Sequence, residues 1–86
     1  MKFFTEKPLI EFVEEHPKYR VAIQDWALKV KKCEWESIDD IVNDFDNAEI
    51  INNTKCVFSF NIGKLHFSIS TMYIGQYVYV REIVRS

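Results

Sequence analysis

The chain has 86 residues and a mass of 10.3 kDa, which predicts a single domain over residues 1–86, because a chain this short builds one hydrophobic core. Hydrophobic residues make up 48% and aromatic residues 15% at a net charge of −2, a composition that excludes intrinsic disorder and does not favour non-specific binding to nucleic-acid phosphates. No apolar run approaches the roughly 20 residues that span a bilayer, so a cytoplasmic protein without a membrane partner is expected.

Three helices are predicted in the first half of the chain, after a short edge strand at residues 2–5. The Thr5 hydroxyl can cap a first helix that begins at Glu6 and stops at His16-Pro17. A second, amphipathic helix follows from Pro17, because apolar residues recur at i, i+3, i+4 and i+7. These residues are Tyr19, Ala22, Ile23, Trp26, Ala27, Val30 and Cys33. A short third helix starts within residues 37–40 and ends near Asn43 or Asp44.

From Glu49 the apolar period becomes that of strands. The predicted strands cover residues 49–51, 55–61, 64–71 and 76–84, with turn residues between them. A four-residue loop over residues 72–75 would place Phe67 opposite Val80 and Ile69 opposite Val78, the register in which both apolar faces coincide. The expected fold class is therefore α+β: a small antiparallel sheet with two N-terminal helices and a short third helix packed on one face.

The opposite face of the last hairpin carries the candidate chemistry. The same register sets His66 opposite Arg81, Ser68 opposite Tyr79 and Ser70 opposite Tyr77. His66 can exchange a proton near neutral pH, Lys64 and Arg81 can neutralise a phosphate, and both tyrosines can stack a base. This combination fits metal-free RNA cleavage by attack of the ribose 2′-OH on its own phosphate. A lone histidine on a solvent-facing strand is more often an ordinary surface residue, and that alternative stays open.

Signatures of other chemistry are absent from the sequence. It contains no glycine-rich phosphate loop, no H-E-x-x-H and no G-x-S-x-G. Cys33 and Cys56 form neither a disulfide framework nor a C-x-x-C pair, so they are interpreted as ordinary half-buried thiols. No metal site and no cofactor are predicted.

Charge is unevenly distributed along the chain. Residues 37–51 carry acidic charges only, which indicates a solvated face or a binding site for a basic partner. Residues 52–86 carry four cations and one acid, so a nucleic-acid surface is more plausible in this C-terminal third than elsewhere. The cations are Lys55, Lys64, Arg81 and Arg85, and the acid is Glu82.

Several segments, taken together and in order, resemble HigB-type toxins of type II toxin–antitoxin systems. The N-terminal part of the resemblance rests on K-P-L-I-E-F at residues 7–12, on His16-Pro17, and on the W-x8-W spacing from Trp26 to Trp35. The C-terminal part rests on V-F-S-F-N at residues 57–61 and on Y-V-R-E-I-V at residues 79–84. The similarity covers nearly the whole chain.

The resemblance implies a RelE-like fold and an endoribonuclease that cleaves mRNA at the ribosome. It also implies a helix-turn-helix antitoxin as partner, and binding to operator DNA only through the complex with that antitoxin. Arg81 matches the family's basic residue directly. Together with the chemistry of the polar sheet face, this makes His66, Arg81 and Lys64 the expected catalytic residues. The expected RNA-binding residues are Tyr77, Tyr79, Ser68 and Arg85.

Two departures from the family pattern leave a second reading open. His66 stands where the family commonly has an arginine. The family also tends to end its last strand with T-H-x-E-Y-D, whereas here Arg85 and Ser86 occupy the T-H places. The alternative is a catalytically weak or inactive relative that retains only antitoxin binding. An unrelated small interaction domain is a third and weaker reading.

Overall fold

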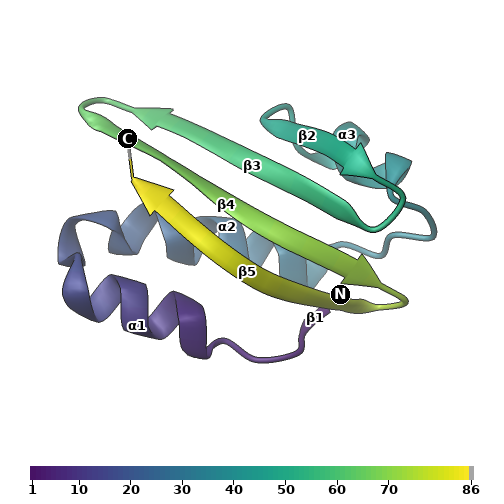
Figure 1. The fold of residues 1–86 in the computed structure, drawn as a ribbon, viewed down its shortest axis with the longest axis horizontal. Coiled ribbons are helices and arrows are strands. Elements are labelled where there is room, and N and C mark those ends of the chain that lie inside the picture. The colour runs from purple at the N-terminus through teal and green to yellow at the C-terminus, as the bar shows by residue number, and fades with distance from the viewer. Residues whose placement is uncertain (86) are drawn as a thin grey trace.

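The computed structural model describes residues 1–85 and shows a five-stranded sheet with helices on one side (Figure 1). The strands are β1 (Lys2–Phe3), β2 (Ala48–Asn52), β3 (Lys55–Ile62), β4 (Leu65–Ile74) and β5 (Tyr77–Arg85), in the spatial order β1-β5-β4-β3-β2. Strands β2 to β5 form an antiparallel meander, and β1 pairs in parallel with the start of β5. The expected α+β fold is confirmed.

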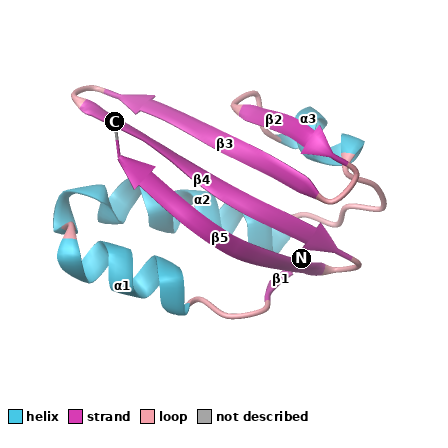
Figure 2. Ribbon diagram, viewed as in Figure 1, coloured by secondary structure: helices cyan, strands magenta, loops and turns pink. Residues whose placement is uncertain are grey.

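The helices lie on the far side of the sheet in the view of Figure 2. They are α1 (Lys7–Glu15), α2 (Arg20–Lys32) and α3 (Asp39–Asp44), and a 3₁₀ turn, η1 (Pro17–Tyr19), joins α1 to α2. The Thr5 hydroxyl accepts the amide N–H of Lys7 at 3.2 Å, but α1 begins at Lys7 and not at Glu6, so Glu6 and not Thr5 occupies the N-cap position. Within residues 1–85, no helix is long and apolar enough to cross a membrane.

The core lies between α2 and the sheet. Trp26 is only 3% exposed and packs edge-on against Phe58 of β3, with 5.2 Å between ring centroids, and against Phe3 of β1 at 5.5 Å. The predicted apolar stripe of α2 is confirmed. Its buried members on α2 are Ile23, Trp26, Ala27 and Val30, and Tyr19 of η1 is buried next to them. Ala22 and the C-cap residue Cys33 are half-buried. One amphipathic helix therefore supplies most of the helical contribution to the core.

Two acids of the segment 37–51 have structural roles that the charge pattern did not indicate. Asp44 accepts a 2.7 Å hydrogen bond from the indole N–H of the buried Trp35. Asp40 accepts the backbone N–H groups of Glu36 and Ser37 at 2.9 and 3.2 Å. These bonds fix the connection between α2 and α3. The acidic segment is thus in part an internal support and not only a solvated face.

We expect Asp44→Ala to destabilise the fold by about 1–3 kcal/mol, because it leaves the buried indole N–H of Trp35 without its acceptor. Urea unfolding measures the difference. Asp46→Ala is the matched control, since Asp46 is an exposed acid two residues further along the chain. Equal unfolding midpoints for the two variants would show that the Trp35 hydrogen bond does not contribute to the free energy of unfolding.

The expected register of the last hairpin is wrong. The loop is the two-residue turn Gly75-Gln76 and not a loop over residues 72–75, so β4 extends three residues beyond its predicted end. Phe67 pairs with Arg85 in place of Val80, and Ile69 pairs with Ile83 in place of Val78. The pairs His66–Arg81, Ser68–Tyr79 and Ser70–Tyr77 are therefore absent. Their observed partners across β4 and β5 are Ser68–Val84, Ser70–Glu82, Met72–Tyr79 and Ile74–Tyr77.

The longer β4 is possible because the polar atoms that it buries are hydrogen-bonded. The Thr71 hydroxyl donates to the Cys56 carbonyl at 3.2 Å, and the Tyr73 hydroxyl donates to the Trp35 carbonyl. Both residues can therefore face the core although each carries a hydroxyl. Gly75 has φ +60°, a conformation that glycine adopts without strain, and this permits the tight turn Gly75-Gln76.

Candidate functional site

The sheet face opposite the helices, here called the open face, carries the candidate site. Residues directly opposite each other on neighbouring strands share a face, so the side chains of the open face form rows across the sheet. Tyr79, Met72 and Lys55 make one row across β5, β4 and β3. The row next to it, further along β5, contains Glu82, Ser70 and Val57.

Two β-bulges flank a hollow between these rows. Ile51 is the extra residue in the pairing of β2 with β3, and Arg81 is the extra residue in the pairing of β5 with β4. Both line the hollow, which has a volume of about 450 Å³. Its side-chain lining on the open face comprises Ile51, Lys55, Val57, Ser70, Arg81 and Glu82. Bulges bend a strand and redirect side chains, and they recur beside active sites.

The hollow can receive an anion. Arg81 and Lys55 approach it from β5 and β3, and neither forms a salt bridge within residues 1–85. Arg81 is exposed and Lys55 is half-buried, so both cations remain accessible to a ligand. The Ser70 hydroxyl and the Glu82 carboxylate add a hydrogen-bonding group and a proton acceptor to the same hollow. This arrangement can hold a phosphate and move a proton beside it.

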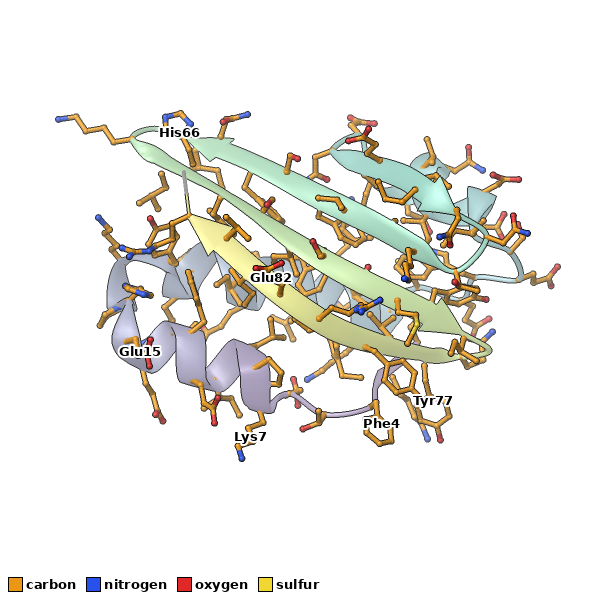
Figure 3. All side chains as sticks on the ribbon, viewed as in Figure 1. Phe4, Lys7, Glu15, His66, Tyr77 and Glu82 are labelled. Atoms are coloured by element: carbon orange, nitrogen blue, oxygen red, sulfur yellow. The ribbon has the colours of Figure 1, made fainter. Side chains whose placement is uncertain are left out.

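His66 and Lys64 lie away from the hollow. Figure 3 shows His66 at the end of the sheet where β3 turns into β4, whereas Glu82 lies midway along β5. The His66 ring Nδ1 is 2.7 Å from the Asn61 side-chain oxygen, its cross-strand neighbour. Along β4, His66 is four residues from Ser70, which corresponds to about 14 Å. His66 does not stand opposite Arg81, and neither His66 nor Lys64 lines the hollow, so the expected three-residue cluster is not formed.

The other predicted RNA-binding residues divide between the two faces. Tyr77, Tyr79 and Ser68 lie on the open face, as expected. Arg85 pairs with the buried Phe67, so it extends on the helix side of the sheet and not toward the hollow. Arg85 was expected on the open face, but the bulge at Arg81 reverses the alternation of the residues that follow it.

A family model for the HigB toxin, the RelE-like toxic component of a toxin–antitoxin system, matches residues 19–85. The chain belongs to the HigB toxin family. The comparison with curated proteins found no match. The matched region runs from the end of η1 to the end of β5 and includes every residue that lines the hollow. Membership in the HigB family confirms the resemblance read from the sequence, and a toxin of such a system has an antitoxin as its partner.

Sequence reasoning missed three positions on the open face of this HigB-family chain. Lys55 and Glu82 were counted as charges but were not assigned to the site, and Phe4 was placed only in an edge strand. One signal was available in the sequence. The apolar positions of β5 are even at Val78, Val80 and Val84 but odd at Ile83, so one uninterrupted alternation does not fit the strand, and a bulge is one cause of such a break.

Neither cysteine of the HigB-family chain takes part in the open face. Cys56 is fully buried, not half-buried as expected, and burial raises the pKa of its thiol. Burial is also the main cause of the raised pKa of the half-buried Cys33, and Asp44 adds to it. Both thiols are free, and a raised pKa keeps them protonated and unreactive. Residues 1–85 contain no group of three or more His, Cys, Asp or Glu side chains that could hold a metal ion.

Proposed function

We propose that this HigB-family chain is an endoribonuclease that cleaves mRNA at the ribosome in the cytoplasm. The observation that supports the proposal best is the hollow between the two bulges, in which Arg81 and Lys55 converge without an acidic salt-bridge partner among residues 1–85. Two cations that line one hollow from the two strands on either side of β4 suit the phosphate of an RNA backbone.

The proposed reaction is metal-independent transesterification. The ribose 2′-oxygen attacks the adjacent phosphorus, a new 2′-O–P bond forms, and the P–O5′ bond breaks to leave a 2′,3′-cyclic phosphate and a 5′-hydroxyl. Arg81 and Lys55 stabilise the charge that develops on the phosphate oxygens in the transition state. Glu82 accepts the proton of the 2′-OH, and solvent supplies the proton for the leaving 5′-oxygen. His66 and Lys64 contact the same RNA molecule at nucleotides beyond the phosphate that is cleaved.

A second candidate function is antitoxin binding by a relative with weak or no catalysis. The observation in its favour is that His66, a candidate general acid or base, does not line the hollow and lies four residues along β4 from Ser70, which corresponds to about 14 Å. Under either function we propose a helix-turn-helix antitoxin, which would carry the complex to operator DNA.

Expression in a bacterial host, with and without a neighbouring helix-turn-helix gene, tests the proposal. We expect growth arrest and mRNA cleavage from the chain alone, and relief of both when the neighbouring gene is present. Growth without arrest and without cleavage would favour the inactive relative.

Purified protein added to programmed ribosomes tests whether the cleavage reaction is independent of metal ions. Cleavage that a chelator abolishes and a divalent ion restores would contradict the proposed reaction.

A further inference from the structure

We propose that Phe4 and Tyr79 form a stacking site for one base of single-stranded RNA, next to the phosphate site at Arg81 and Lys55. The inference rests on the proposed endoribonuclease function and extends it, because it names the group that positions the substrate on the open face. The site joins the two ends of the chain, since Phe4 follows β1 and Tyr79 belongs to β5.

The backbone fixes Phe4 in place. Its amide N–H donates to the Val78 carbonyl at 3.0 Å, so the residue continues the pairing of β1 with β5. The Phe4 ring stacks on Tyr79, with 4.8 Å between centroids and an angle of 25° between the ring planes. Phe4 is nevertheless 64% exposed. A phenylalanine that is held rigidly but left in solvent offers its free ring surface to a ligand.

Three aromatic side chains gather at this end of the open face. Figure 3 shows Phe4 and Tyr77 beside each other at the end of the sheet remote from His66, and Tyr77 is 47% exposed. Exposed aromatic rings on a sheet are the platforms on which RNA-binding domains stack unpaired bases. An RNA base presents a flat ring of matching size, and stacking tolerates any of the four bases.

The spacing between the aromatic pair and the cations fits one RNA strand. Tyr79 lies in the same row as Lys55, with Met72 between them, and Arg81 is two residues further along β5. Two residues of a strand span about 6–7 Å, and three neighbouring strands span about 10 Å. A base on the Phe4 ring therefore leaves the attached phosphate within reach of Arg81 and Lys55.

Charge sets the direction in which the RNA leaves the aromatic pair. Beyond Tyr77 the surface forms a depression that is lined by several acids together with Lys2. These acids are Glu34, Glu36, Asp40 and Asp44. They repel phosphate groups. In the opposite direction lie the hollow and then His66 and Lys64 at the turn between β3 and β4. The bound RNA therefore runs from the aromatic pair across the hollow toward the turn between β3 and β4.

The test measures binding of a 2′-O-methyl hexaribonucleotide, which cannot be cleaved because it lacks the attacking hydroxyl. Fluorescence anisotropy of the labelled oligonucleotide at low salt gives the Kd. We expect Phe4→Ala to weaken binding by about 5- to 100-fold, the effect of losing one stacked base. Phe4→Trp should retain binding, because it restores a flat ring. Val21→Ala is the control, since it shortens another exposed apolar side chain, located on α2.

A second variant separates stacking from charge. Arg81→Ala should weaken binding and also reduce its salt dependence, whereas Phe4→Ala should leave the salt dependence unchanged. Melting curves of all variants confirm that they fold. Equal affinities of wild type and Phe4→Ala would overturn the stacking site, and so would absence of any binding by the wild type. Growth arrest and mRNA cleavage are measured separately, so the proposed function can stand when the stacking site fails.

A protein partner on the same surface gives a different result. If Phe4→Ala abolished neutralisation by the antitoxin while RNA affinity stayed at the wild-type value, the aromatic pair would be part of a protein interface and the proposal would be wrong.

Discussion

Arg81→Ala should lower the rate of mRNA cleavage by about 10²- to 10³-fold. Arg81 is the bulged residue of β5 and lines the hollow, where its guanidinium would stabilise the charge that develops on the phosphate in the transition state. Removal of one such donor has an effect of this size in other enzymes. Rates are measured with purified protein and programmed ribosomes, and growth arrest on expression provides an independent readout.

Arg85→Ala is the matched control for this variant. It removes the same side chain from the same strand, but on the helix side of the sheet. His66→Ala should also have a smaller effect than Arg81→Ala, because His66 lies about 14 Å from the level of the hollow. If Arg81→Ala cleaved RNA as fast as Arg85→Ala, the reaction would take place elsewhere on the molecule. If His66→Ala were the most damaging variant, the site would lie at the turn between β3 and β4.

Trp26→Ala should destabilise the fold by about 3–5 kcal/mol. Trp26 is 3% exposed and contacts aromatic rings from β1 and β3, so its truncation leaves a cavity at the centre of the core that the surrounding rings cannot fill. Urea unfolding followed by circular dichroism measures the loss.

Trp26→Phe should have a much smaller effect, for two reasons. It keeps most of the ring volume, and it removes an indole N–H that has no hydrogen-bond partner among residues 1–85. A buried donor without a partner costs about 1–3 kcal/mol, so its removal offsets part of the lost packing. Unchanged unfolding midpoints for Trp26→Ala would contradict the position of Trp26 in the core.

Periodicity was sufficient to predict the elements of this fold. The α2 stripe and all four strands of the meander follow from the spacing of apolar residues, because burial of one face imposes that spacing. The short α3 was predicted from a different signal, a cap residue followed by acids within residues 37–40. The family was also recognisable, since its segments occur in order along the chain. Tyr77, Tyr79 and Ser68 were placed correctly on the open face, because alternation alone determines the face of a regular strand.

Pairing between strands could not be predicted in the same way. An alternating pattern states which face a residue occupies but not which residue stands opposite to it. Thr71 and Tyr73 look like turn or surface residues in the sequence, yet their hydroxyls find partners in the core and β4 continues through them. The extension of β4 to Ile74 shifts the register, so Arg81 lies away from His66 and lines the same hollow as Lys55 of β3. Contacts of this kind depend on tertiary structure.

The pairing of β1 with β5 also constrains how the protein assembles during synthesis. Residues 2 and 3 leave the ribosome long before their partners, residues 77 and 78. Closing a loop of that length carries a large entropic cost, and long-range pairings of this type form slowly. The Phe4 ring cannot meet Tyr79 until β5 has been translated. We therefore expect the nascent chain to lack a complete open face, so that a fragment released early by the ribosome would have no RNA-stacking site.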